Sequence, residues 1–450
     1  MSKPNPMSGF PEFLPAQRFV ELHVIEQVRR TFELHGFAPV ETRAVEPLEQ
    51  LLRKGETSKE VYVLRRLQAD AEGDDAGIGL HFDLTVPFAR YVLENAGKLE
   101  FPFRRYQIQK AWRGERPQEG RFREFTQADI DIVGKDVLPF HHDIEVARVM
   151  AEALVGLPLP PMRLQVNNRK LIQGFYAGIG ATDIEAVMRV IDKIDKVPAE
   201  VVAGMLVDEA GLDDTQAKRC LELADIRSTD TSFAERVRAL GVSNELLEEG
   251  LAELKAVIEG CASVTSDRFA VEADLRIARG LDYYTGTVFE TTMVGYESLG
   301  SICSGGRYDS LASDGRTTYP GVGISLGVSR MLVPLLSRGV LTADRSVPSA
   351  VLVALPSEED RGRCDAIAQQ LRAGGVPTEV AATPQKFGKQ IRYAERRGIP
   401  YVWFPGDGGG PDQVKDIRSG EQHDADAATW TPPAADLTPT ITSNALEEIS

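Results

Sequence analysis

The sequence predicts a mixed α/β (α+β) protein whose principal sheet is antiparallel. Residues 101–113 and 122–133 both alternate apolar and polar side chains on either side of a turn rich in glycine, proline and charge, which is typical of a hairpin. Residues 171–260 are rich in Ala, Leu, Glu and Asp and show little strand pattern, which predicts a helical insertion. From residue 349 onward, strand and helix patterns alternate, as in a small α/β domain.

The remaining elements follow in chain order. Val20, Val24 and Val28 share one row of an amphipathic helix over 16–36, which Gly36 ends. Further segments are predicted as a strand or loop over 37–47, a short strand leading into a helix over 80–94, a helix over 143–153, and strand and helix alternation over 269–294 and 321–335. In the last part the pattern is strand 350–355, helix 359–373, strand 378–380, helix 388–397 and strand 401–404.

These patterns divide the chain into domains. The strand and helix alternation resumes after the helical stretch, so the first domain is expected to be discontinuous. The predicted boundaries are 1–170 with 261–336 for that domain, 171–260 for the insertion, 348–425 for the small α/β domain and 426–450 for a tail that is ordered only in part.

Composition excludes several classes of protein. The chain has 450 residues, of which 26% are charged and 42% hydrophobic, as in globular proteins. No window approaches 18 uninterrupted apolar residues, and no secretory signal precedes Phe10, so a cytoplasmic protein without membrane spans is expected. The four cysteines form no C-x-x-C pair and the six histidines include one adjacent pair without a third ligand, so no metal site made of protein side chains is predicted.

Charge is unevenly distributed. The net charge of −16 argues against a nucleic-acid partner, yet residues 104–123 carry seven basic residues against two acids. A second basic stretch covers 386–397. Two basic patches on an acidic body favour local binding of a polyanion, and two solvated basic faces remain the alternative.

The hairpin also carries polar chemistry. Gln127, Asp129 and Asp131 share one face of the second strand, and apolar residues occupy the other face. A buried polar face needs partners or a ligand. Gly321, Gly323 and Gly327 precede Arg330 in a spacing that differs from the dinucleotide fingerprint, and close helix-to-strand packing explains them equally well.

Several motifs together resemble those of the histidyl-tRNA synthetases, a class II family, over about residues 9–422. Residues 112–117 and 123–127 are similar to class II motif 2, and 321–330 to motif 3. Residues 279–284 and 304–309 resemble the two signatures peculiar to the histidine enzymes, and 82–90 their amino-acid loop. Residues 386–390 and 398–402 resemble the anticodon-binding domain.

The resemblance implies a role for each matched residue. Arg113 and Arg279 would be catalytic, and Arg113, Glu115 and Arg330 would bind ATP. Histidine would be bound by Asp83, Thr85, Gln127, Asp131, Arg279, Tyr283, Tyr284 and Tyr308. Arg116, Gln118 and Arg121 would face the acceptor end of the tRNA. The implied partners are L-histidine, ATP with Mg²⁺, tRNA-His and a second copy of the chain in a homodimer.

Physical chemistry agrees with these roles. Attack of a carboxylate on the α-phosphate of ATP builds charge on phosphate oxygens, which the guanidinium forks of arginines stabilise. Imidazole offers one donor and one acceptor near neutrality, which Asp131 and Tyr284 can match. On a strand, Arg279 and Tyr284 would point to opposite faces, so the run must turn if both serve one histidine, and Gly280 permits that turn.

The chain also departs from the bacterial pattern. It has Asp83 and Asp131 where many bacterial members carry glutamate, and Ala44 where motif 1 has proline. With the run 167–170, the aspartates indicate the eukaryotic-type branch. The main alternative function is a histidine-sensing paralogue that regulates ATP phosphoribosyltransferase without charging tRNA. A generic nucleotide-binding protein is a third reading, but it leaves the polar strand face unexplained.

Overall fold

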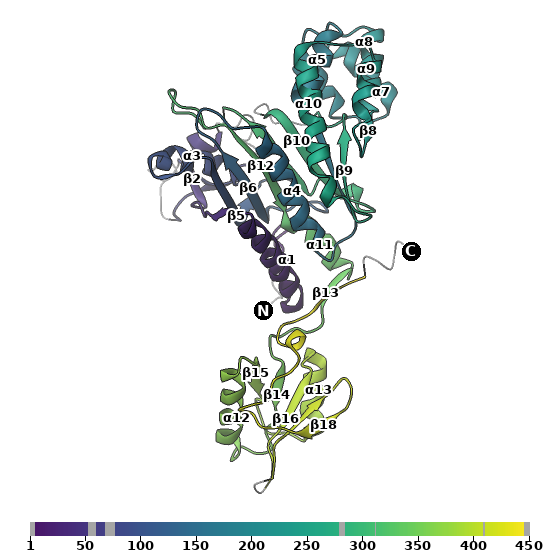
Figure 1. The fold of residues 1–450 in the computed structure, drawn as a ribbon. Helices are drawn as coiled ribbons and strands as arrows, with labels where there is room; N and C mark the ends of the chain where they lie inside the picture. The colour runs from purple at the N-terminus through teal and green to yellow at the C-terminus, as the bar shows by residue number, and fades with distance from the viewer. Residues whose placement is uncertain are drawn as a thin grey trace. The chain divides into compact units, whose positions relative to one another are not determined.

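The computed structural model describes residues 5–52, 60–67, 77–278, 284–310, 312–407 and 410–444. The chain forms two compact units (Figure 1). The first comprises Met1–Pro11 and Val24–Pro334, and the second Glu12–His23 and Leu335–Ser450. The predicted α/β architecture is confirmed. Among the described residues, no helix combines the length and the apolar character that crossing a membrane requires.

A nine-stranded sheet forms the centre of the first unit. In spatial order its strands are β1 (Ala38–Pro39), β5 (Phe103–Trp112), β6 (Glu124–Val133), β12 (Gly321–Gly327), β11 (Cys303–Tyr308), β10 (Tyr284–Met293), β7 (Met162–Asn168), β9 (Phe269–Asp274) and β8 (Arg227–Ser228). The pairs β1–β5 and β7–β9 are parallel and the other neighbours are antiparallel. Strands far apart in sequence therefore meet at the sheet centre.

The predicted hairpin is confirmed as β5 and β6. Its register pairs Phe103 with Val133 at one end and Trp112 with Glu124 at the other. Ala128, Ile130 and Ile132 of β6 are fully buried, and the alternate residues are the polar ones. Because side chains alternate between the faces of a sheet, this single strand supplies both a core face and a polar face.

Helices cover one face of this sheet. The helix α4 (His141–Val155) packs against β12 and β6, and α10 (Glu245–Gly260) packs against β7 and α4 (Figure 1). Val24, Val28 and Phe32 of α1 (Pro15–Leu34) are fully buried. The helix α11 (Val328–Ser337) follows β12 directly.

A small three-stranded sheet adjoins the principal one. It consists of β2 (Val45–Pro47), β4 (Ile78–Leu80) and β3 (Val63–Leu64), with the short helix α2 (Leu48–Leu51) after β2. The helix α3 (Thr85–Asn95) begins soon after β4. Asp83 and Leu84 directly precede this helix, and Thr85 is its first residue.

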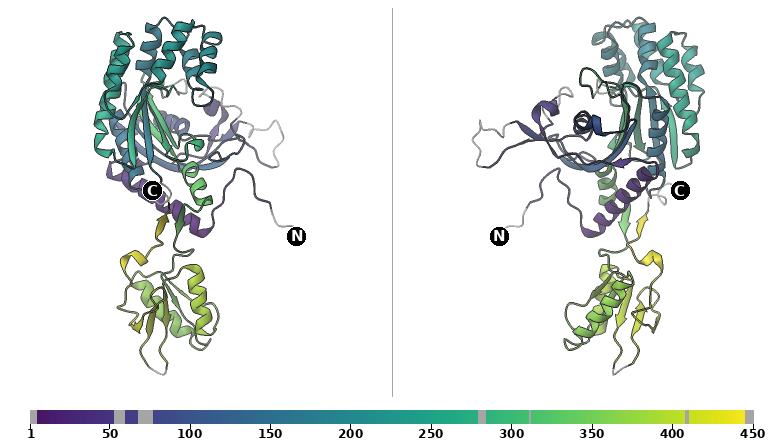
Figure 2. Two further views of the ribbon diagram at one scale, coloured as in Figure 1. Left: turned by 90° about the vertical axis from the view of Figure 1, so that its right-hand side faces the viewer. Right: turned by 60° about the vertical axis from the view of Figure 1, so that its left-hand side comes forward.

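Residues 169–260 form helices joined by short connections, with β8 as their one strand, and lie at one end of the sheet (Figure 2, teal). Their helices are α5 (Arg169–Gly178), α6 (Ile184–Ile191), α7 (Ala199–Asp208), α8 (Asp214–Ala224), α9 (Phe233–Ala239) and α10. Polar side chains cap several of them: Asn168 accepts from the backbone of Lys170, and Asp213 and Gln216 form a capping box. Such caps satisfy helix N–H groups that have no partner within the helix.

The second unit has its own sheet in the order β15 (Thr378–Val380), β14 (Val351–Val353), β16 (Tyr401–Phe404), β17 (Gln413–Asp416) and β18 (Gln422–Asp424). The helices α12 (Arg361–Ala373) and α13 (Phe387–Arg397) complete the α/β pattern. A separate pair joins β13 (Leu341–Ala343) to β19 (Ile441–Ser443). The sequence patterns did not predict β17, β18 or this pair.

Candidate functional site

The polar face of β6 forms one wall of the site. Gln127, Asp129 and Asp131 are 8%, 3% and 4% exposed. The facing residues of β12 are small, because Gly327, Ser325 and Gly323 lie opposite these three in register. The buried polar groups therefore lie over a strand that leaves room for them.

Asp131 is held on two sides. Its Oδ2 lies 2.6 Å from Nη2 of Arg105, which is fully buried, and its Oδ1 accepts a 2.9 Å hydrogen bond from the hydroxyl of Tyr308. The guanidinium of Arg105 also lies 4.2 Å from the ring centroid of Phe88. A buried carboxylate needs such compensation, since an isolated buried charge is costly.

Two of the motif glycines make this arrangement possible. A Cβ on Gly323 would lie 2.1 Å from Asp131 Oδ1, and one on Gly321 would lie 2.4 Å from the ring of Tyr308. Both distances are far below van der Waals contact. These two glycines therefore make room for residues of the neighbouring strands β6 and β11, and the helix-to-strand packing expected as the alternative is not what surrounds them.

A small cavity of about 30 Å³ lies against this wall. Four of the residues predicted to bind histidine line it: Thr85, Asp131, Tyr284 and Tyr308. Asp83 lies close by and accepts a 3.0 Å hydrogen bond from the N–H of Val86, so it caps the first turn of α3. The structure thus brings these predicted residues together from α3, β6, β10 and β11.

A second cavity of about 100 Å³ is rich in cations. Arg113, Glu115, Arg121 and Arg330 line it together with Phe125 and Gln127. The Arg113 guanidinium lies 5.2 Å from the Phe125 ring centroid, and its Nε donates to the carbonyl of Phe82 at 3.0 Å. Arg330 donates to the carbonyls of Gly120 and Ser301 at 2.9 and 2.8 Å. Ser304 and Ser325 line both cavities, so the two adjoin.

The turn between β5 and β6 holds the predicted acceptor-end residues. Gln118 and Arg121 pair through their backbones, and Arg121 lies 3.4 Å from the carboxylate of Glu115. Arg116 lies in the same turn but, like Gln118, is not part of the cavity wall. Arg279, Gly280 and Tyr283 lie outside the described residues, as does the turn predicted for them.

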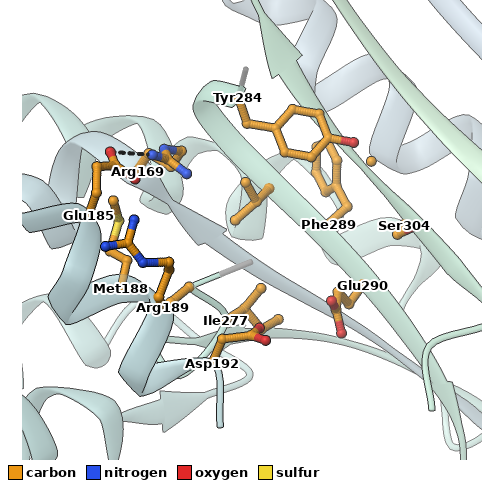
Figure 3. A pocket seen from close by; sticks show the side chains of 13 residues that line it. Arg169, Glu185, Met188, Arg189, Asp192, Ile277, Tyr284, Phe289, Glu290 and Ser304 are labelled. Carbon is orange, nitrogen blue, oxygen red and sulfur yellow. Dashed lines mark hydrogen bonds and ion pairs between the residues drawn. The ribbon is translucent and has the colours of Figure 1, made fainter. Parts of the chain in front are cut away.

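A further cavity, of about 440 Å³, is also lined by Tyr284 and Ser304. Figure 3 shows Arg169, Glu185, Met188 and Arg189 on one side of it, facing Tyr284 and Glu290 on the other. Arg169 Nη2 lies 2.8 Å from Glu185 Oε1. The helical region 169–260 therefore supplies one wall of a cavity that reaches the edge of the polar site.

Sequence reasoning missed Arg105 and Ser325 as parts of the site and treated Arg104 and Arg105 as members of a basic patch. That expectation is wrong for both arginines, because Arg104 pairs with Glu145 and Arg105 with Asp131. Arg105 lies directly opposite Asp131 in the hairpin. Counting the two strands outward from their shared turn would have revealed the pair.

Asp129 has the most unusual environment of the site. Burial raises the pKa of its carboxyl group to about 7, although Arg105 and the Ser325 hydroxyl both oppose the shift. An unfolded aspartate titrates near a pH of about 4. Between these values the folded protein holds a proton that the unfolded chain has released, so Asp129 lowers stability as pH rises from about 4 to about 7.

Asp129→Asn is therefore expected to gain stability relative to the parent protein as pH is raised from about 5 to about 8. Urea midpoints of both proteins across this range measure the effect. The buried aspartate Asp274, whose pKa burial also raises to about 7, stays unchanged in both proteins and cancels in the comparison. Curves that run parallel over the whole range would contradict the assignment.

The sequence of this chain matches family models and known proteins over most of its length. Residues 9–331 match the family model of histidyl-tRNA synthetase, and residues 350–425 match that of an anticodon binding domain. The histidine–tRNA ligase of Cutibacterium acnes is 59% identical, covering 98% of this chain and 99% of its own. That of Thermobifida fusca is 53% identical over 95% and 98%.

A solved histidyl-tRNA synthetase from Nostoc sp. PCC 7120 superposes with a TM-score of 0.84 at 34% identity, covering 95% of this chain and 98% of that one. These relatives are bacterial, so the predicted closeness to the eukaryotic-type branch is not supported. The aspartates at 83 and 131 do not by themselves indicate that branch.

Proposed function

Because the chain belongs to the histidyl-tRNA synthetase family, we propose that it is a histidine–tRNA ligase. It activates L-histidine with ATP to histidyl-adenylate and transfers the histidine to the 3′-hydroxyl of the terminal adenosine of tRNA-His. The observation that carries this proposal is the pair of adjoining cavities, one polar and built around Asp131, the other rich in arginine.

Histidine binds in the polar cavity. Asp131 and Tyr284 accept from and donate to the two imidazole nitrogens, and Tyr308 lines the ring pocket. A carboxylate offers about four lone-pair sites, so Asp131 can accept from the ligand while Arg105 and Tyr308 hold it. Asp83, Thr85 and Gln127 bind the α-ammonium, and Tyr283 and Arg279 complete the site from the segment between Ala278 and Tyr284.

ATP binds in the cationic cavity. Its adenine stacks at Phe125, Glu115 orients the nucleotide, Arg113 binds the α-phosphate and Arg330 the γ-phosphate. Several guanidinium groups in one small cavity suit a triphosphate. Mg²⁺ would be held mainly by phosphate oxygens with few protein ligands, which fits a cavity in whose described wall Glu115 is the one carboxylate.

Arg113 and Arg279 are the catalytic residues. Activation breaks the bond between the α- and β-phosphates as the histidine carboxylate attacks the α-phosphorus and pyrophosphate leaves. Negative charge shifts onto phosphate oxygens, where fixed guanidinium groups stabilise it. Arg113 is preorganised for this by the Phe82 carbonyl and the Phe125 ring.

The tRNA is bound at two places. Arg116, Gln118 and Arg121 in the β5–β6 turn contact the acceptor end, whose unpaired bases are accessible for recognition. The second unit binds the anticodon, with the basic helix α13 as its cationic surface, since Lys386, Lys389, Arg392 and Arg396 are exposed.

The domains assigned to these tasks are 1–170 with 261–336 for catalysis, 171–260 as the insertion, 348–425 for the anticodon, and a tail over 426–450.

A homodimer and a cytoplasmic location complete the proposal, the latter because aminoacyl-tRNA is consumed by cytoplasmic translation. The direct test is histidine-dependent ATP–pyrophosphate exchange by the purified protein, followed by charging of total tRNA with labelled histidine. Both activities are expected. Histidine binding without adenylate formation would instead favour the regulatory paralogue of ATP phosphoribosyltransferase, and the absence of histidine binding would refute both functions.

A further inference from the structure

The side-chain amide of Gln127 is buried, and only its NH₂ group has a hydrogen-bond partner among the described residues. Its Nε2 donates a 2.6 Å hydrogen bond to Oγ of Ser325. Its Oε1 is buried and, within the described part of the chain, makes no hydrogen bond. A buried carbonyl oxygen without a donor is destabilising, so this oxygen is suited to a donor that a ligand brings. Gln127 is 8% exposed and lines the cationic cavity, together with Ser304 and Ser325, which the two cavities share.

A relay of hydrogen bonds determines which end of the amide faces the site. Above the Asp129 pKa of about 7 its carboxylate can only accept, and the hydroxyl of Ser325 donates to its Oδ1. A serine hydroxyl has one proton, so a Ser325 that donates to Asp129 can only accept from Gln127. The NH₂ group of Gln127 must then face Ser325, and its carbonyl oxygen must face the other way.

The strands fix the relay in place. Ser325 lies opposite Asp129 in the antiparallel register of β12 and β6, and Gln127 lies next to Asp129 on the same face. Asp129 is 3% exposed, and the charged groups around it are Arg105, Asp131 and Asp83. The carboxylate therefore has no alternative rotamer in solvent.

We propose that Asp129 and Ser325 are positioning residues for the substrate's α-ammonium, because they orient the Gln127 amide so that its oxygen accepts from that group. The proposal rests on the proposed function, in which Gln127 binds the ammonium. Without the relay the amide can turn, and its NH₂ group then opposes a cation. Both residues line the polar cavity, and in this proposal they act on the ammonium through the Gln127 amide.

Two histidine analogues separate this role from a general effect on folding. Histidinol has the ammonium and lacks the carboxylate, and imidazolepropionate has the carboxylate and lacks the ammonium. In Ser325→Ala, affinity for histidinol is expected to fall on the order of tenfold, the value of one hydrogen bond to a charged group. Affinity for imidazolepropionate should not change. Calorimetric titration of each analogue into the full-length protein at a pH of about 8, where Asp129 is ionised, measures both.

Conservative variants should rescue binding. Ser325→Thr keeps the hydroxyl, and Asp129→Asn keeps an acceptor for it, so both should bind histidinol as the parent does, whereas Asp129→Ala should show the selective loss. Ser228→Ala, which removes an exposed hydroxyl in residues 169–260, serves as the matched control.

Each result of the analogue titrations supports or overturns the proposal. Equal loss of both analogues in Ser325→Ala, or loss of neither, overturns the relay. If the parent protein binds histidine and catalyses exchange while Ser325→Ala retains full histidinol affinity, the relay fails and the proposed function stands. If the parent binds neither analogue and shows no exchange, both proposals fall.

Discussion

Replacing Arg113 with alanine is expected to lower the rate of histidine-dependent pyrophosphate exchange by about 10²–10³-fold, the typical cost of removing one preorganised group that stabilises transition-state charge. The guanidinium is held by the carbonyl of Phe82 and the ring of Phe125 inside the cationic cavity. Since both contacts exist without substrate, loss of Arg113 removes an interaction that needs no reorganisation during the reaction.

Steady-state exchange at saturating and limiting ATP separates the two possible effects. A lower kcat indicates loss of charge stabilisation, and a raised KM for ATP alone indicates loss of binding. Arg238→Ala is the control, since this arginine is an exposed partner of Glu248 remote from both cavities. Exchange by Arg113→Ala within a few-fold of the parent would show that the cavity is not where activation occurs.

Arg105→Ala is expected to destabilise the first unit by about 3–5 kcal/mol, because it leaves Asp131 as an uncompensated buried carboxylate. Arg105 is fully buried, 2.6 Å from Asp131 and packed on Phe88, so water does not readily replace it. The variant should also bind histidine poorly, since Asp131 loses the group that fixes it.

Hydrogen–deuterium exchange can localise this effect. Peptides from β5 and β6 should lose protection, and peptides from β14 and β16 in the second unit provide an internal reference. The matched variant Arg29→Ala removes an arginine whose pairs with Glu26 and Glu33 are exposed, and surface pairs contribute about 0–1 kcal/mol. Similar protection in Arg105→Ala and Arg29→Ala would show that the buried pair contributes no more than an exposed one.

Much of the fold could be predicted because side-chain period and turn chemistry are local. The hairpin β5–β6 shows both, and the alternation of its second strand is enough to place Gln127 and Asp131 on one polar face. The strands β17 and β18 could not be predicted in this way, since Gln413–Asp416 and Gln422–Asp424 are polar and form strands by pairing with β16 and with each other.

The site was predicted in part for a similar reason. Motif residues that carry charge, such as Arg113 and Arg330, stand out in the sequence and lie in one cavity. Residues that orient other side chains cannot be recognised in the sequence by their type. Ser325 has a role only because β12 places it opposite Asp129. Arg105 was misassigned because a run of like charges predicts a surface only if all its members point the same way, and neighbours on a strand do not.

The positions of the three tryptophans make intrinsic fluorescence a useful probe of this protein. Trp403 and Trp430 pack edge to face in the second unit, with ring centroids 5.6 Å apart. Trp112, which directly precedes Arg113 in the sequence, lies in the first unit. Its indole N–H donates to Glu124, and its ring centroid lies 5.5 Å from that of His81. A protein with phenylalanine at 403 and 430 would emit from a single indole, that of Trp112 on β5, so unfolding of the first unit could be followed by intrinsic fluorescence without any label.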